Sequence, residues 1–367
     1  KGVLRVLGIQ LIICACFIVQ YNIALRESQL RRLCLITLIS STLGYMVGVI
    51  LAMRGAGVWS LVTATLAIYL FQTIGLWLTT KAYPTLEINK GAFKKLVPYS
   101  GFIYFATIID QAYIHGLSMI LGKRFSATTL GYYTQANKLQ MVPSMSIQDV
   151  GYQVLFPDFS RFQSSPNILK ERYRKNLRLL TILSVLGFSI LFLAAEPLVL
   201  LLFTEKWLPS VPMLRILTPV GLFLVLSFIP TLLIRSVGKA KSYFILISIE
   251  RLIGIVILIV LSGLGIYETL WGLVGLNIAY FLFNVYYVSQ LTVITMKEQL
   301  SDILPILLLQ GAVILAIDCL FSSMAFPNIL VEILIDLVIP CCSVLIFCSL
   351  LGLTSRSELR ALLKRRK

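Results

Sequence analysis

The sequence predicts an all-α membrane protein, a polytopic helical bundle, from its hydropathy, its long apolar stretches and the distribution of its charges. Of its 367 residues, 58% are hydrophobic and only 13% are charged, which is about half the charged share of an ordinary soluble domain. The mean hydropathy is +0.90. A soluble fold of this composition would expose more apolar surface than water tolerates, and a disordered chain would be far less apolar. Both of these classes are therefore excluded.

Eleven stretches are long and apolar enough to cross a bilayer, which takes about 20 residues in a helix. They cover residues 3–23, 33–53, 57–79, 96–121, 130–155, 177–203, 212–237, 243–263, 268–290, 303–321 and 330–353. The sequence lacks the alternation over about 10 residues that is typical of a membrane β-barrel. Because lipid offers the backbone no hydrogen-bond partners, we expect every stretch to be a helix.

The placement of the cations predicts an orientation in the membrane. The chain carries 32 Lys and Arg against 16 Asp and Glu, a net charge of +16. If residue 1 lies outside, the inside loops and tail hold 23 cations and the outside loops hold four, namely Arg54, Lys123, Arg124 and Lys206. Such an excess marks the cytoplasmic side, so we expect a cytoplasmic C-terminus. Charge spread over many short loops also argues against a nucleic-acid partner.

Two segments about 210 residues apart resemble each other, which predicts two lobes. Each runs from an arginine, through a span with a central glycine, to a tryptophan: Arg26, Gly44 and Trp59, then Arg235, Gly254 and Trp271. If the first three spans match spans seven to nine, the chain is N-terminally truncated and holds 11 of a probable total of 14 helices. The lobes would be related by an axis along the membrane normal, with the transport path between them. The alternative is a chance similarity of apolar helices.

This repeat divides the chain into three expected parts. Residues 1–90 are the C-terminal half of the first lobe, and residues 91–290 are the second, six-helix lobe. Residues 291–367 are two extra helices and a basic cytoplasmic tail.

Two neighbouring stretches carry polar faces that predict a hydrophilic cavity. In 130–155, polar residues recur at steps of four and three, which places them on one side of a helix: Tyr133, Asn137, Gln140, Ser144 and Gln148. The stretch 96–121 repeats this pattern with Tyr104, Thr107, Gln111 and Ser118. Polar residues in a span are costly and usually face the bundle interior. The alternative is a set of hydrogen bonds that hold the helices together.

An anionic substrate would suit this cavity, because Lys138, Arg215 and Arg251 bring charge and several donors to a phosphate. The candidate cavity residues are Lys138, Asn137, Gln140, Tyr133, Gln148, Arg215, Arg251, Tyr104 and Gln111. The candidate ion-coupling carboxylates are Asp110, Asp149 and Glu250. Glu250 and Arg251 are adjacent and point about 100° apart on a helix, so we expect each to bond another helix.

The sequence gives no sign of catalysis. It has no Gly-rich phosphate loop followed by Lys and Ser or Thr, and no His, Cys or Asp cluster with metal-ligand spacing. Its seven cysteines show no disulfide or zinc pattern. We therefore predict a protein that is not an enzyme and that uses no cofactor and no metal.

Four motifs, in order, resemble a known family. Residues 55–62, 130–139, 156–163 and 203–217 are similar to its GxGxWxLV, LGxYxxAxxL, PxxSxxQ and GxxWxxxxPxLxxL segments. Together they resemble the Wzx-type polysaccharide and O-antigen flippases, lipopolysaccharide biosynthesis proteins of the polysaccharide transporter family in the MOP exporter superfamily. Thr204 stands where the family usually has Gly, and the resemblance implies that three further helices of the first lobe precede residue 1.

The resemblance implies a MATE-like, two-lobed transporter of the bacterial inner membrane. It would move undecaprenyl-diphosphate-linked oligosaccharide, the repeat unit of O-antigen, capsule or exopolysaccharide, to the periplasmic side by alternating access. Its partners would be this lipid-linked oligosaccharide, membrane lipid, and polysaccharide polymerase and chain-length proteins. Two alternatives stay open: a multidrug/cation antiporter of the same superfamily, whose cavity should be acidic, and a non-transporting remnant or scaffold of a polysaccharide assembly complex.

Overall fold

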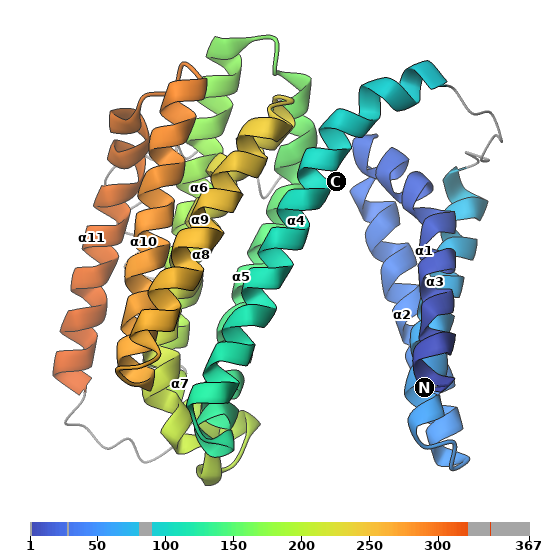
Figure 1. Cartoon of the computed structure of the whole chain (residues 1–367), viewed down its shortest axis with the longest axis horizontal. Helices are drawn as coiled ribbons and strands as arrows, with labels where there is room; N and C mark the ends of the chain where they lie inside the picture. The colour runs from blue at the N-terminus through green and yellow to red at the C-terminus, as the bar shows by residue number, and fades with distance from the viewer. Residues whose placement is uncertain (1, 28, 81–89, 322–337, 339–367) are drawn as a thin grey trace. The chain divides into compact units, whose positions relative to one another are not determined.

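The protein is built of helices joined by short turns, as a computed structural model describes it for residues 2–27, 29–80, 90–321 and 338. The predicted all-α class is confirmed. The chain divides into two compact units, one ending at Ala92 and the other beginning at Phe93 (Figure 1). The predicted span at 330–353 lies outside the described residues, apart from position 338.

The first unit contains three helices, α1 (Gly2–Arg26), α2 (Leu30–Met53) and α3 (Val58–Thr80). Helix α3 packs against both of the others. The indole Nε1 of Trp77 also donates a hydrogen bond of 2.8 Å to the carbonyl oxygen of Cys16 in α1. The tight α2–α3 turn depends on Gly55 and Gly57, whose φ angles of +79° and +51° favour a residue without a Cβ.

The second unit begins with two helices of 35 residues each and continues with shorter ones. Its elements are α4 (Lys90–Arg124), α5 (Ala127–Arg161), α6 (Pro166–Leu193), α7 (Ala195–Leu202), the 3-10 helix η1 (Glu205–Ser210), α8 (Val211–Ser236), α9 (Ala240–Leu261), α10 (Ile266–Leu291) and α11 (Met296–Phe321). Helix α8 is central, because it packs against α5, α6, α9 and α10. Of the predicted spans, 96–121 and 130–155 lie within α4 and α5.

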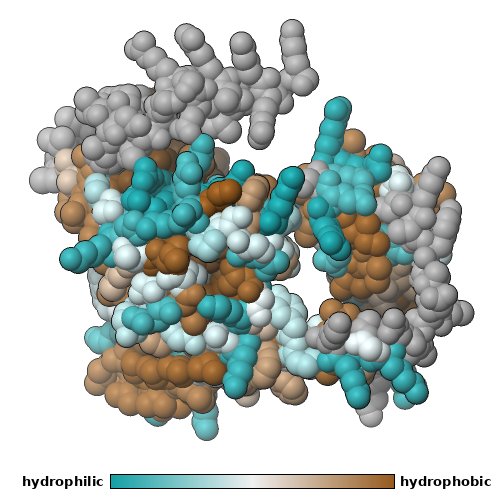
Figure 2. Space-filling view, turned by 90° about the horizontal axis from the view of Figure 1, so that it is seen from above, coloured by the Kyte–Doolittle hydropathy of each residue, from teal (hydrophilic) through white to brown (hydrophobic). Residues whose placement is uncertain are grey.

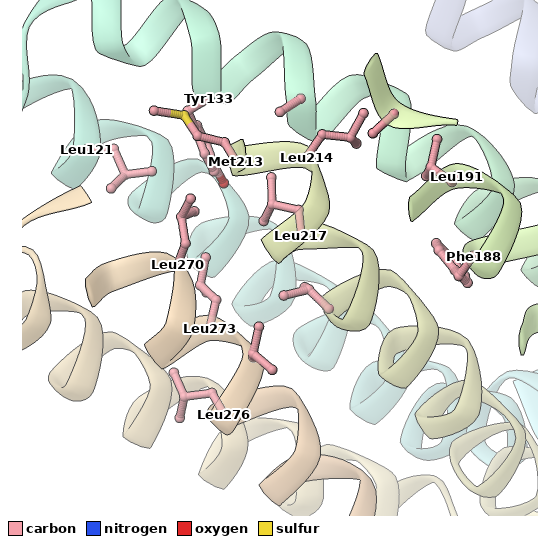
Figure 3. Packing of buried hydrophobic residues seen from close by; sticks show 14 of the residues in the cluster. Leu121, Tyr133, Phe188, Leu191, Met213, Leu214, Leu217, Leu270, Leu273 and Leu276 are labelled. Carbon is pink, nitrogen blue, oxygen red and sulfur yellow. The ribbon is translucent and has the colours of Figure 1, made fainter. Parts of the chain in front are cut away.

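The core of this unit is layered along α8, which is apolar on nearly all sides. Near one end, Leu217 of α8 faces Leu270 and Leu273 of α10 (Figure 3), and Leu214 belongs to the same buried cluster. A second cluster around Leu226 to Ile234 of α8 continues to the other end. A helix that is hydrophobic all round is stable only when other helices surround it, which accounts for the central position of α8.

Eight of the described helices are long and apolar enough to cross a membrane. They are α1, α2, α3, α6, α8, α9, α10 and α11. Helices α4 and α5 are longer but fall outside this group because of their polar residues. On α9, Leu252, Val256 and Val260 are 63–65% exposed. A row of large apolar side chains at helical spacing on the outside of the bundle is typical of a lipid-facing surface.

The two glycines that the sequence repeat aligns occupy the same kind of place. A Cβ on Gly44 of α2 would collide with Ile68 of α3, and a Cβ on Gly254 of α9 would collide with the Tyr280 hydroxyl of α10. Each glycine therefore leaves room for a side chain of the next helix, Ile68 in the first case and Tyr280 in the second.

Helix α11 is fastened to α6 by ion pairs near one end of the bundle. The Asp302 carboxylate accepts two hydrogen bonds from Arg174, at 2.7 and 3.0 Å, and one from Arg178 at 2.7 Å. Lys170 pairs with Glu298 at 2.6 Å. Because the Asp302 side chain is only 5% exposed, its charge depends on these arginines for stabilisation.

The close contact between α5 and α8 can be tested at Gly221. A Cβ at this position would collide with Gln140 of α5 and Phe188 of α6. We predict that Gly221→Ala lowers the free energy of unfolding by about 1–3 kcal/mol through overpacking, measured as a lower Tm of the purified protein in detergent. Gly275→Ala in α10 is the matched control, because its Cβ would meet nothing within 4 Å. Equal Tm values for the two variants would contradict this packing.

Candidate functional site

The second unit presents most of its cations at one end of the bundle. This end, at the top of Figure 1, is formed by the start of α4 and by the α5–α6, α8–α9 and α10–α11 connections. We call it the basic end. Its cations include Lys94, Arg161, Lys170, Arg172, Lys239, Lys241 and Lys297, whereas Lys123, Arg124 and Lys206 lie at the opposite end. Figure 2 looks on to the basic end and shows hydrophilic side chains spread across it.

The predicted polar face of α5 is divided between the protein core and the surface. Gln140 and Ser144 are buried, and the Gln140 Nε2 donates to the Ser144 hydroxyl at 2.8 Å. Tyr133 is also buried and lies beside Met213 of α8 (Figure 3). These three side chains therefore take part in the contact between α5 and α8. The remaining α5 candidates are more accessible: Asn137 and Gln148 are half-buried, and Lys138 and Asp149 are exposed.

The predicted polar residues of α4 lie mostly at its surface. Tyr104 is 65% exposed and Gln111 is exposed as well. Thr107 donates its hydroxyl proton to the Ile103 carbonyl of its own helix, as Ser118 does to Ile114. Asp110 differs from these residues, because its carboxylate bonds another helix.

An ion pair between Asp110 and Arg251 joins α4 to α9. The Arg251 Nε donates to the Asp110 Oδ1 at 2.6 Å. The guanidinium also lies 4.8 Å from the ring centre of Tyr113 and 5.6 Å from that of Tyr280. The Arg251 side chain is 14% exposed and that of Asp110 is 32% exposed. A charge-assisted bond in such a sheltered place, with two aromatic faces beside the cation, holds α4, α9 and α10 together.

Glu250 precedes Arg251 in α9 and is more deeply buried than either member of this pair. It is only 3% exposed, and its backbone carbonyl accepts a hydrogen bond of 2.6 Å from the Tyr280 hydroxyl. Its carboxylate Oε1 is buried without a hydrogen-bond partner among the described residues. We call Asp110, Tyr113, Glu250, Arg251 and Tyr280 the interior charged cluster.

The three cations expected to meet one phosphate are not joined by any contact among the described residues. Arg251 is held by Asp110, and Lys138 is exposed on α5. Arg215, in the first turns of α8, lies 5.8 Å from the ring centre of Phe192 in α6. Its Nε is buried and has no hydrogen-bond partner in the part of the chain described.

Sequence reasoning missed three residues of interest. Tyr113 and Tyr280 flank Arg251, and nothing in a single sequence distinguishes them from other aromatic residues of a span. Arg235 lies near the end of the predicted span 212–237, and the structure places it in the last turn of α8 between two tyrosines. Its position at the end of an apolar stretch is the only signal that could have pointed to it. No group of three or more His, Cys, Asp or Glu among the described residues could hold a metal ion.

Comparison with known proteins identifies the family. Residues 1–212 match the family model described as "Polysaccharide biosynthesis protein", and since this match covers more than half of the chain, the protein belongs to that family. The chain is 24% identical over 233 residues to the succinoglycan biosynthesis transport protein ExoT of Rhizobium meliloti (strain 1021), which is 62% of this chain and 46% of that protein. It is 25% identical over 139 residues to the lipopolysaccharide biosynthesis protein WzxC of Escherichia coli (strain K12), which is 38% of this chain and 28% of that protein.

A solved structure supports the same fold. The chain resembles the lipid II flippase MurJ in its inward closed conformation, with a TM-score of 0.57 and 14% identity, over 86% of this chain and 66% of MurJ. The chain spans about half the length, or less, of the curated relatives it matches. The resemblance to Wzx-type flippases that the four motifs indicated is confirmed.

The ion pair of the interior charged cluster can be tested by a double-mutant cycle. We predict that Asp110→Asn destabilises the protein, because it leaves the Arg251 charge in a sheltered place with no carboxylate bonded to it. Arg251→Met made in the Asp110→Asn protein should restore part of the loss, with a coupling of roughly 1–3 kcal/mol. The Tm in detergent gives the measurement.

Asp149→Asn is the matched control for this cycle, because it removes an exposed carboxylate from α5. We expect its Tm to stay at the wild-type value. If the effects of Asp110→Asn and Arg251→Met were simply additive, the two side chains would not depend on each other.

Proposed function

We propose that the protein is an inner-membrane flippase that moves undecaprenyl-diphosphate-linked oligosaccharide to the periplasmic side by alternating access. The observation that carries this proposal is a MurJ-like fold in a chain of the polysaccharide biosynthesis family. Two relatives are named for succinoglycan transport and for lipopolysaccharide biosynthesis. The proposed cargo is therefore the repeat unit of an O-antigen, capsule or exopolysaccharide, and the proposed activity is transport rather than catalysis.

Three cations on α5, α8 and α9 support an anionic cargo. A diphosphate that crosses a bilayer needs cations to replace the water it loses. Arg251 and Lys138 supply such cations on α9 and α5, and Arg215 supplies one on α8. In this proposal Asp110 neutralises Arg251 while the protein is empty, and the diphosphate of the cargo takes the place of Asp110 during transport. Glu250 and Asp149 remain candidates for ion coupling beside Asp110.

The polar candidates would act at different stages. Tyr104, Gln111, Asn137 and Gln148 are accessible enough to meet a glycan without rearrangement. Gln140 and Tyr133 are buried against α8, so they would reach the cargo only if α5 and α8 move apart. Polysaccharide polymerase and chain-length proteins are the proposed partners that take over the translocated repeat unit.

We further propose that the basic end faces the cytoplasm, together with the C-terminus. The excess of Lys and Arg at this end supports the orientation. Residues 1–90 would then belong to the first lobe, 91–290 would form the second lobe, and 291–367 would form the extra helices and tail.

The orientation predicts which residues a reagent outside the cell can reach. In a variant with its native cysteines replaced, Lys206→Cys should react with a membrane-impermeant maleimide added to intact spheroplasts. Lys241→Cys, at the basic end, should react only after the membrane is broken. The opposite pattern would reverse the orientation, and labelling of both sites in intact spheroplasts would show that the membrane is not sealed.

The transport function predicts a loss of surface polysaccharide when the gene is deleted, and its recovery when the full-length protein is supplied. Lys138→Ala should reduce the surface polymer several-fold at unchanged membrane abundance, because it removes an accessible cation from the proposed path. Lys123→Ala, which removes an exposed cation at the end of α4, is the control and should leave the polymer unchanged. Polymer at the wild-type level in the deletion strain would contradict the flippase function.

A further inference from the structure

The basic end contains an arginine enclosed by tyrosines from three other helices. Arg235, in the last turn of α8, has its guanidinium 5.0 Å from the ring centre of Tyr243 in α9 and 5.8 Å from that of Tyr152 in α5. The Tyr99 hydroxyl of α4 donates to the Arg235 carbonyl oxygen at 2.9 Å. Four helices therefore meet at this residue and fix the direction of its backbone and side chain.

The guanidinium of Arg235 has no carboxylate partner among the described residues, unlike four other arginines of this unit. A guanidinium offers five N–H donors, and none of those of Arg235 is bonded to a described residue. Its Nε is fully buried and unbonded. By contrast, carboxylates of the chain neutralise Arg172, Arg174, Arg178 and Arg251. A sheltered cation with unused donors is costly unless an anion from elsewhere binds it.

The tyrosines around Arg235 add to its capacity to bind an anion. Their rings hold the guanidinium by cation–π contact without using its N–H donors. The hydroxyls of Tyr152 and Tyr243 make no hydrogen bond with described residues, so they can donate to the same anion. Arg215 also has an unbonded, buried Nε, but it lies against a single Phe ring, which brings no hydroxyl.

We infer that Arg235, Tyr152 and Tyr243 form a phosphate-binding site at the basic end, which takes the phosphate of a lipid headgroup. The planar guanidinium of arginine can donate to two phosphate oxygens at once, and the tyrosine hydroxyls can donate to the remaining oxygens. Two lipids carry this chemistry: the diphosphate-linked cargo, if the proposed function holds, and the phospholipids of the bilayer. The site would be the first contact of the cargo on the cytoplasmic side.

The location of this site relative to the interior charged cluster suits a first contact. Tyr243 and Glu250 are seven residues apart on α9, which is two helical turns or roughly 10 Å, so they share one face of the helix. A phosphate released by Arg235 would move about this distance along α9 to reach the level of Arg251. The unpaired arginine would bind first, since Arg251 must give up Asp110 before it can bind an anion.

The experiment measures lipid binding by the purified full-length protein in detergent, with native mass spectrometry as the readout. The probes are undecaprenyl diphosphate and, separately, phosphatidylglycerol. Arg235→Gln should weaken the binding of undecaprenyl diphosphate about tenfold or more, the effect of losing charge-assisted bonds. Lys241→Gln removes an exposed cation from the same end and should change binding less than about twofold.

Two further variants keep the inference testable if Arg235→Gln does not fold. Arg235→Lys retains the charge but loses the planar, bidentate guanidinium. Its affinity for the lipid should lie between those of the wild type and Arg235→Gln. Tyr152→Phe combined with Tyr243→Phe keeps both rings and removes only the hydroxyls, and should weaken binding several-fold. If a variant keeps the wild-type Tm, its weaker lipid binding results from the changed side chain and not from unfolding.

The two probes distinguish the source of the phosphate. A loss confined to undecaprenyl diphosphate assigns the site to the cargo, and an equal loss for both probes assigns it to any lipid phosphate, including that of the bilayer. Unchanged binding of both probes by Arg235→Gln would overturn the inference. Failure of the proposed function gives a different result, because surface polysaccharide would then be independent of the gene while the lipid binding of Arg235 persisted.

Discussion

A charged side chain inside a membrane bundle has to find an opposite charge or unused donors and acceptors, and this constraint organises the second unit. Asp110 supplies the anion for Arg251, and aromatic rings from two helices cover the cation. The same constraint fastens α11 to α6, where Asp302 lies between two arginines. Ion pairs of this kind connect helices that apolar packing alone would leave free to slide, because lipid and leucine are equally apolar.

Helix α8 gives these charges a rigid support. Its apolar surface is packed by α5, α6, α9 and α10, so the ends of α8 are fixed relative to their neighbours. Arg215 and Arg235 occur at those two ends and turn toward different helices, α6 in one case and α5 with α9 in the other. The core thus supplies the geometry, and the polar residues on α4, α5 and α9 supply the chemistry that a flippase for a diphosphate-linked lipid would need.

Hydropathy alone was sufficient to predict the all-α membrane class, since apolar helices in lipid leave few alternatives. The polar residues noted in 96–121 and 130–155 make α4 and α5 too polar to be counted among the apolar spans. Helical periodicity placed Tyr133, Asn137, Gln140 and Gln148 on one side of α5, but it could not distinguish a contact with α8 from a wall of a cavity. Whether this side of α5 is covered depends on which helix packs against it, and the spacing of residues along one helix does not contain that information.

The pairing of charges was beyond sequence reasoning for a similar reason. Asp110 and Arg251 are 141 residues apart in the chain, so only the tertiary fold reveals that they neutralise each other. The angle between Glu250 and Arg251 is a property of the helix itself, so it could be read from the sequence, but the partners of the two side chains could not. Arg235 could not be identified from the sequence, because a cation at the end of a span gives the same sequence pattern whether it is solvated or enclosed by tyrosines.

We propose that this protein recognises its cargo through a negative headgroup. The most direct test reconstitutes the full-length protein in proteoliposomes and measures the rate at which two lipids change leaflet. One is an undecaprenyl-diphosphate-linked oligosaccharide, and the other carries the same sugars on undecaprenol without phosphate. We expect rapid movement of the diphosphate lipid and movement of the uncharged lipid at the protein-free rate. Equal, protein-dependent movement of both lipids would contradict it.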